Sequence, residues 1–165
     1  MFKINDYIVY KRNVCKIKEI KKDEETNKKY YVLLPMEDES LTINVPISNE
    51  HGFIRNIISK TEVEKIIKSI PNIEMLTSAN DKIMEQNYKT HFSDGSHEAL
   101  IKIIKTTFAR NKERLANNKK TAEKDTTYFK KAERLLYNEF SIALDMTYDE
   151  TKKYVRDKVD ALLEK

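Results

Sequence analysis

The sequence predicts an α+β protein, in which a small antiparallel β-barrel or half-barrel precedes an all-α helical domain. Two observations support this class. Before Pro46, short segments rich in Ile, Val, Tyr and Leu alternate with polar stretches, as strands and turns do. After Ser59, apolar residues recur at helical spacing. We therefore expect one domain over residues 1–58 and a second over residues 59–165.

Four segments in the first half of the chain are predicted strands. They cover residues 2–10, 14–20, 30–34 and 41–45. In the last of them Leu41, Ile43 and Val45 alternate with two polar residues, so these three are expected to face one side. The connections are too short for crossover helices, which predicts an antiparallel sheet. Pro46 ends the last clear strand, because proline has no N–H for the ladder.

The first predicted helix begins near Ser59 or Thr61. Thr61 and Glu64 have the spacing of a capping box, with Ser59 as an alternative cap. Pro71 is expected to end this helix, because the residue before a proline disfavours helical geometry.

Three further helices follow, together with a weaker one over residues 81–91. Ser96 can cap a helix with one apolar face. That face comprises Leu100, Ile101, Ile104, Phe108 and Leu115. Another helix is expected over residues 126–144, and the capping box from Thr147 to Glu150 opens the last one.

Length and composition exclude several classes of protein. Hydrophobic residues make up 39% of the chain and charged residues 35%, which indicates a folded, charge-rich protein. No apolar run approaches the roughly 18 residues of a membrane span, and the N-terminus lacks a signal-peptide pattern, so we expect a cytoplasmic protein without a membrane partner. Two glycines leave no room for a glycine-rich phosphate loop.

No set of residues predicts a catalytic or metal site. His51, His91 and His97 are scattered, without cysteines or carboxylates at metal-ligand spacing around them. The single Cys15 cannot form an internal disulfide and is expected to be a small core residue in a strand. We therefore expect no enzymatic activity, no cofactor and no metal.

The cationic side chains are concentrated in one segment. Residues 102–134 carry 11 basic and 4 acidic side chains, whereas residues 1–75 carry 13 basic and 12 acidic ones. Such a segment is typical of a surface that neutralises nucleic-acid phosphates. Lysine-rich helix faces also occur as ordinary solvated surfaces, so the charge alone leaves both interpretations open.

The segment 41–45 is expected near a sheet edge, because it is short, follows an acidic turn and ends in proline. An edge strand has unpaired backbone groups and can accept a strand from a partner. Polar neighbours can instead protect the edge. The local sequence does not distinguish these two possibilities.

Several segments resemble the CarD family of bacterial RNA polymerase-binding regulators, in a Firmicutes-like branch. Residues 2–10 read FKINDYIVY, residues 29–35 KYYVLLP and residues 41–46 LTINVP, and in this order they are similar to the strands of the family. The helical segments 101–106, 128–137 and 139–144 resemble the family's C-terminal module. The resemblance covers nearly the whole chain and rests on order and spacing.

The resemblance implies a Tudor-like N-terminal module that adds its edge strand to a sheet of the polymerase β subunit. Carried over, this contact falls on Thr42, Ile43, Asn44 and Val45, with Lys22 at a nearby basic position. The helices of the family contact double-stranded promoter DNA at the upstream edge of the melted bubble. The corresponding basic residues are Lys105, Arg110, Lys112, Arg114, Lys119, Lys120, Lys130, Lys131 and Arg134.

The chain departs from the family pattern in three places. It has no tryptophan, and the region that aligns with the family's tryptophan wedge reads NDKI at residues 80–83. Asn44 occupies a position where some members carry arginine. The turn at residues 11–13 lacks the glycine often found there.

Together these features predict a CarD-type transcription regulator, nucleoid-associated in the cytoplasm. The β module would bind RNA polymerase while the helices bind promoter DNA and alter open-complex stability. The alternative is a protein-only adaptor whose helices form a rigid spacer.

Overall fold

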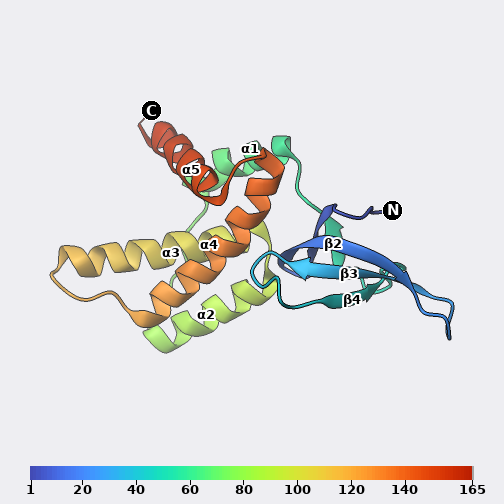
Figure 1. Ribbon diagram of the computed structural model, residues 1–165. Helices are drawn as coiled ribbons and strands as arrows, with labels where there is room; N and C mark the ends of the chain where they lie inside the picture. Colours follow the sequence, from blue (N-terminus) through green and yellow to red (C-terminus); the bar gives the residue numbers. More distant parts are fainter. Residues whose placement is uncertain (165) are drawn as a thin grey trace. The chain divides into compact units, whose positions relative to one another are not determined.

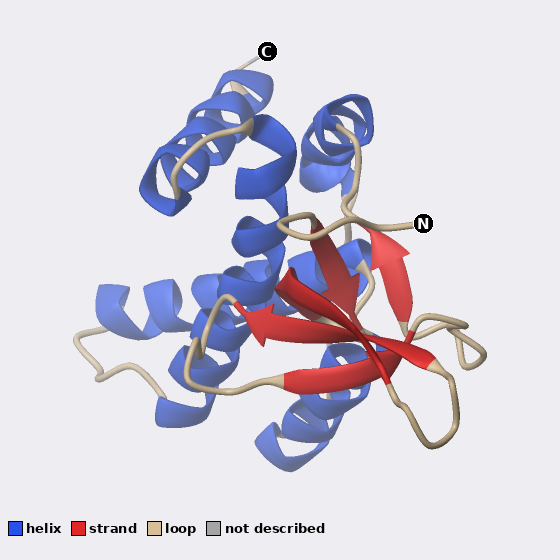
Figure 2. Ribbon diagram, turned by 45° about the vertical axis from the view of Figure 1, so that its right-hand side comes forward, coloured by secondary structure: helices blue, strands red, loops and turns tan. Residues whose placement is uncertain are grey.

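The computed structural model describes residues 1–164, and the chain divides into two compact units, Met1–Ser59 and Lys60–Lys165 (Figure 1). An antiparallel sheet makes up the first unit, and helices make up the second (Figure 2). The predicted α+β class is confirmed.

The sheet of the first unit has the strand order β4-β3-β2-β1-β5. The strands are β1 (Tyr7–Tyr10), β2 (Asn13–Lys22), β3 (Lys29–Pro35), β4 (Ile43–Pro46) and β5 (Ile54–Asn56). Ile8, Cys15 and Leu33 lie fully buried in its core, so Cys15 is the small core residue that the sequence predicted. The pairing of β2 with β3 shifts register between Ile17 and Glu19, and such a bulge bends a sheet.

Three strand predictions were wrong in detail. The first strand begins at Tyr7, because the chain turns at Asn5, whose φ is 76°. Leu41 lies outside β4 and is 50% exposed, because its N–H donates to the carbonyl of Asp38 in a turn. β4 ends at Pro46, as predicted, but the sequence did not predict the further strand β5, which follows it and pairs with β1.

The second unit consists of α1 (Lys60–Ser69), the 3-10 helix η1 (Ile70–Asn72), α2 (Asp81–Asp94), α3 (His97–Ala116), α4 (Glu123–Leu144) and α5 (Tyr148–Leu163). The capping box of Thr147 and Glu150 at α5 is confirmed. Ser96 caps α3 by accepting from the N–H of Ala99. Thr61 lies inside α1, so the predicted capping box at Thr61 is wrong and the helix begins directly after Ser59.

The buried face of α3 differs from the predicted one. Leu100 and Ile101 are buried, but Phe108 and Leu115 are 57% and 60% exposed. The helix instead buries Thr106 and Thr107. Their hydroxyls donate to carbonyls one turn earlier in the same helix, which satisfies the hydroxyls inside the unit.

Candidate functional sites

β4 is an edge strand that pairs only with β3 within the described chain. The N–H of Ile47 donates to the carbonyl of Lys29 at 3.2 Å. Because backbone groups in an antiparallel ladder alternate in direction, Val45 directs its N–H and C=O toward β3, and Asn44 and Pro46 direct theirs away. Proline has no N–H, so the outward donor of β4 is the N–H of Asn44. The predicted edge position is confirmed.

The side chains of the predicted polymerase contact divide between the two faces of β4. Val45 is 7% exposed and belongs to the core, and Ile43 packs partly against the same core. Asn44 and Thr42, which precedes the strand, are exposed. A partner strand would therefore meet the backbone and the two polar side chains.

Lys22 lies at the end of β2 and is exposed. Its partner across the ladder is Lys29, whose carbonyl accepts from Ile47 just beyond β4. Lys22 therefore lies at the same end of the sheet as Pro46, two strands away from it.

The opposite edge of the sheet, β5, is covered by the side chain of Asn49. Lys11 donates its N–H to the carbonyl of Phe53 at 2.7 Å, so by the same alternation Ile54 directs its backbone groups away from β1. The amide of Asn49 meets both groups: Oδ1 accepts from the Ile54 N–H at 3.1 Å and Nδ2 donates to the Ile54 C=O at 3.0 Å. The Asn49 side chain thus makes the two hydrogen bonds that a neighbouring strand would make with Ile54.

A second contact covers β5 further along. The Arg55 guanidinium donates to the carbonyl of Asn56 at 3.0 Å, which the alternation also directs outward. Ile54 and Asn56 thus both have outward groups with internal partners. The sheet consequently offers a partner strand β4 and not β5.

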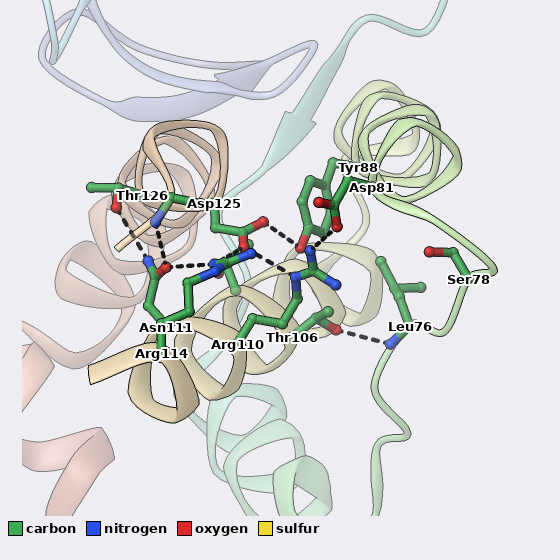
Figure 3. Close-up of polar contacts among 12 residues, drawn as sticks. Leu76, Ser78, Asp81, Tyr88, Thr106, Arg110, Asn111, Arg114, Asp125 and Thr126 are labelled. Carbon is green, nitrogen blue, oxygen red and sulfur yellow. Dashed lines mark hydrogen bonds and ion pairs between the residues drawn. The ribbon is translucent and has the colours of Figure 1, made fainter. Parts of the chain in front are cut away.

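In the helical unit, Asp125 joins three helices (Figure 3). It lies in the first turn of α4 and is 3% exposed. Its carboxylate accepts from the Tyr88 hydroxyl of α2 at 2.8 Å, from Arg110 Nε of α3 at 3.0 Å, and from Arg114 of α3. Arg110 also donates to Asp81 at 2.6 Å. Two of the predicted DNA-binding arginines therefore stabilise the fold.

The pKa values of Asp125 and Tyr88 are shifted by the contacts that the Asp125 carboxylate makes. Burial alone would raise the pKa of Asp125, but the hydrogen bonds from Arg114, Arg110 and Tyr88 outweigh it and hold the pKa below its usual value. Burial and the hydrogen bond to Asp125 both raise the pKa of the Tyr88 hydroxyl. Asp125 is thus a charged, fully compensated acceptor at neutral pH.

Lys105 also makes internal contacts. Its ammonium donates to the carbonyl of Ile70 in η1 at 2.7 Å and to that of Ile73, which follows η1, at 2.6 Å. Burial lowers its pKa. This lysine is likewise a structural residue of the helical unit.

The other six predicted DNA-binding residues are exposed, and we call them the outward cations. They lie at the end of α3, in the following loop and along α4. They are Lys112, Lys119, Lys120, Lys130, Lys131 and Arg134. The Lys131 ammonium lies 5.9 Å from the ring centre of Tyr128, and the Arg134 guanidinium 5.0 Å from that of Tyr148.

Asn111 anchors the loop that carries two of the outward cations. Its Oδ1 accepts from the N–H of Ala122 at 3.1 Å and from Arg114 at 2.8 Å. At the start of the loop, the N–H of Lys119 donates to the Arg114 carbonyl at 2.8 Å. Both ends of the loop are therefore held, which positions Lys119 and Lys120.

Three structural residues of these sites were not predicted: Asn49, Asn111 and Asp125. The sequence contained a feature that could have indicated Asp125, because it is one of only four acidic side chains among residues 102–134 and lies at the start of a helix. Asn49 and Asn111 had no such feature, because their partners are distinguished only by where backbone groups point in the folded chain.

Within residues 1–164, no group of three histidine, cysteine or acidic side chains is arranged to hold a metal ion. None of the helices described is both long and apolar enough to cross a bilayer.

Comparison with known protein families identifies the first unit. Residues 2–58 match the CarD-like/TRCF RID domain. This is a CarD-like, RNA polymerase-interacting domain. For residues 2–58 the match confirms the CarD-like resemblance, and the matched domain family is non-catalytic. The helical unit lies outside the matched residues, and a search of curated proteins gave no match to the chain.

Replacing Asp125 by asparagine is expected to destabilise the helical unit by about 3–5 kcal/mol at pH 7, because two arginines would lose their shared countercharge. In the wild type the folded pKa lies below the usual 3.8. The carboxylate's contribution is therefore present above about pH 4 and lost as the pH falls through the folded pKa. Urea unfolding at pH 7 and pH 3 measures both effects.

Asp81→Asn is the control, because Asp81 contacts the same Arg110 but its side chain is 87% exposed; its loss should be below about 1 kcal/mol. An Asp125→Asn protein as stable as the wild type at pH 7 would contradict the structural role.

Asn49→Gly is expected to open the β5 edge and cause concentration-dependent self-association, because the outward groups of Ile54 lose their partner. Glycine tolerates the φ of 50° at this position, so the backbone is preserved. Sedimentation velocity measures the change. Asn27→Gly is the matched control: Asn27 has a φ of 63° in a turn away from the edge. A monomeric Asn49→Gly protein would argue against the covering role.

Proposed function

We propose that this protein is a CarD-like regulator that bridges RNA polymerase and promoter DNA. Its CarD-like domain binds the polymerase through β4, and the outward cations of the helical unit bind nearby DNA. The observation that carries the proposal is the difference between the two sheet edges: in a polymerase-binding domain, β4 is open and β5 is covered by Asn49.

The polymerase contact is strand addition to the β subunit. The N–H and C=O of Asn44 provide the central pair of hydrogen bonds, and the Pro46 carbonyl provides another acceptor. Lys22 adds a positive charge at the Pro46 end of the sheet. Main-chain hydrogen bonds give this contact its affinity, and the exposed side chains of Thr42 and Asn44 adjust it.

The DNA contact is electrostatic. The outward cations neutralise phosphates and release counterions, which gives affinity with little dependence on base sequence. Because the polymerase holds the protein beside the promoter, even weak DNA affinity suffices at the resulting effective concentration. The bound protein then alters the stability of the open complex.

Lys105, Arg110 and Arg114 have an indirect role in this proposal. Their contacts with η1 and Asp125 hold α2, α3 and α4 together. They position the outward cations, and any DNA contact of their own would require breaking these bonds.

The proposal includes no apolar wedge from the start of α2. Asn80 caps this helix by accepting from the N–H of Ile83 at 2.9 Å, and Asp81 binds Arg110. Both side chains serve the helix start, and the Asp81 carboxylate would be repelled by phosphate.

Asn44→Pro is expected to weaken binding to RNA polymerase about tenfold, because proline removes the outward donor and its ring occupies the space of the added strand. The N–H of Asn44 takes no part in the pairing with β3, so the fold should persist, as circular dichroism can verify. Biolayer interferometry with polymerase core enzyme measures the affinity. Asn44→Ala keeps the N–H and should bind nearly normally. Equal binding by Asn44→Pro would exclude strand addition at β4.

A second experiment tests the DNA contact. The double variant Lys119→Glu/Lys120→Glu should reduce retention of a promoter fragment by the polymerase complex and lower the slope of log affinity against log salt by about 2. The matched control is Lys153→Glu/Lys158→Glu on α5, which reverses the same number of charges. If neither double variant affects retention while polymerase binding is intact, the protein-only adaptor is favoured.

A further inference from the structure

A hollow of about 190 Å³ borders the open edge of the CarD-like domain. Residues 44–46 of β4 line one side of it. The loop residues 48–51, together with Tyr10 and Phe53, line the other. The hollow therefore lies at the seam where the sheet stays open between β4 and β5.

A strand that pairs with β4 must run along this seam. The backbone N–H and C=O of Asn44 point away from β3, and Asn44 itself lines the hollow. Side chains of an added strand alternate between its two faces, so one of them can enter the hollow. Its volume fits one side chain, in the manner of the specificity pockets of strand-addition sites.

The walls of the hollow are suited to a positive charge. The rings of Tyr10 and Phe53 lie 6.2 Å apart edge to face, and His51 stacks on Phe53 at 5.5 Å. The Lys11 ammonium already lies 4.9 Å from the ring centre of Phe53 and 5.5 Å from that of Tyr10. These rings thus attract a cation within the protein itself.

Glu50 supplies the countercharge. Among the described residues that line the hollow, it is the one with a carboxylate, and none of them is lysine or arginine. Glu50 is exposed, so it can meet a group that arrives from outside. A guanidinium suits the site best, because its plane stacks on aromatic rings while its edge binds a carboxylate.

We infer that this hollow is a specificity pocket for a basic side chain, arginine or lysine, of the strand that RNA polymerase adds to β4. The inference rests on the proposed function and specifies the chemistry of the partner strand. Lys11 competes with the incoming cation for the same rings, and Glu50 attracts it.

The two charged residues should therefore act with opposite signs. In the full-length chain, Glu50→Gln is expected to weaken binding to polymerase core enzyme about fivefold, and Lys11→Met to strengthen it by a similar factor. Methionine keeps the apolar length of lysine and leaves the backbone N–H in place. Glu39→Gln is the control for charge, because Glu39 is an exposed carboxylate before β4 that does not line the hollow; its affinity should be unchanged.

A titration with small probes checks the side-chain class directly. N-acetyl-arginine amide is expected to shift the NMR resonances of Tyr10 and Phe53 in the wild type and to shift them less in Glu50→Gln. N-acetyl-leucine amide should leave them in place. A stronger response to the leucine probe would overturn the assignment of a basic side chain.

The outcomes separate this inference from the proposal on which it rests. If Asn44→Pro weakens polymerase binding but neither Glu50→Gln nor Lys11→Met changes it, the pocket is excluded and strand addition remains. If both charge variants act with reversed signs, the hollow takes an acidic side chain and the inference is wrong. If Asn44→Pro also binds normally, strand addition at β4 itself is excluded.

Discussion

The alternation of backbone hydrogen bonds in an antiparallel sheet is the constraint on which the CarD-like domain depends. A five-stranded sheet that does not close has two edges, and each directs every second N–H and C=O outward. In this protein the two edges differ: Asn49 satisfies the outward groups of Ile54 on β5, and Asn44 on β4 keeps its groups available. One asparagine side chain thus leaves β4 as the edge with an outward donor and acceptor for a partner strand.

In the helical unit, the cationic residues also fall into two groups, one that stabilises the fold and one that is exposed. The cationic segment contains Asp125, which is buried, and a buried carboxylate requires compensation. Arg110 and Arg114 provide it through their ion pairs with this carboxylate. The outward cations are exposed instead. A count of positive residues therefore overstates the surface available to nucleic acid, because part of that charge stabilises the fold.

The difference between the two sheet edges and the difference between the two groups of cations together relate the fold to the proposed function. In the proposed function, the open edge would provide a rigid backbone template for the polymerase, and the loop anchored by Asn111 would present Lys119 and Lys120 on a fixed scaffold. Rigid presentation lowers the entropy lost on binding. The inferred pocket beside Asn44 would add side-chain selectivity to a contact that main-chain bonds alone leave unselective.

The sequence by itself determined the fold class, the segments of β2, β3 and β4 and of the α-helices α1 to α5, and the caps at Ser96 and Thr147, because periodicity and capping depend on residues within a few positions of one another. It also indicated the edge position of β4 and the CarD family. Tertiary structure alone decided that Arg110, Arg114 and Lys105 bond to internal acceptors, that Phe108 is exposed, and that Asn49 covers β5. Each of these depends on groups brought together from separate elements, or on the direction of a backbone bond, and neither is encoded in local spacing.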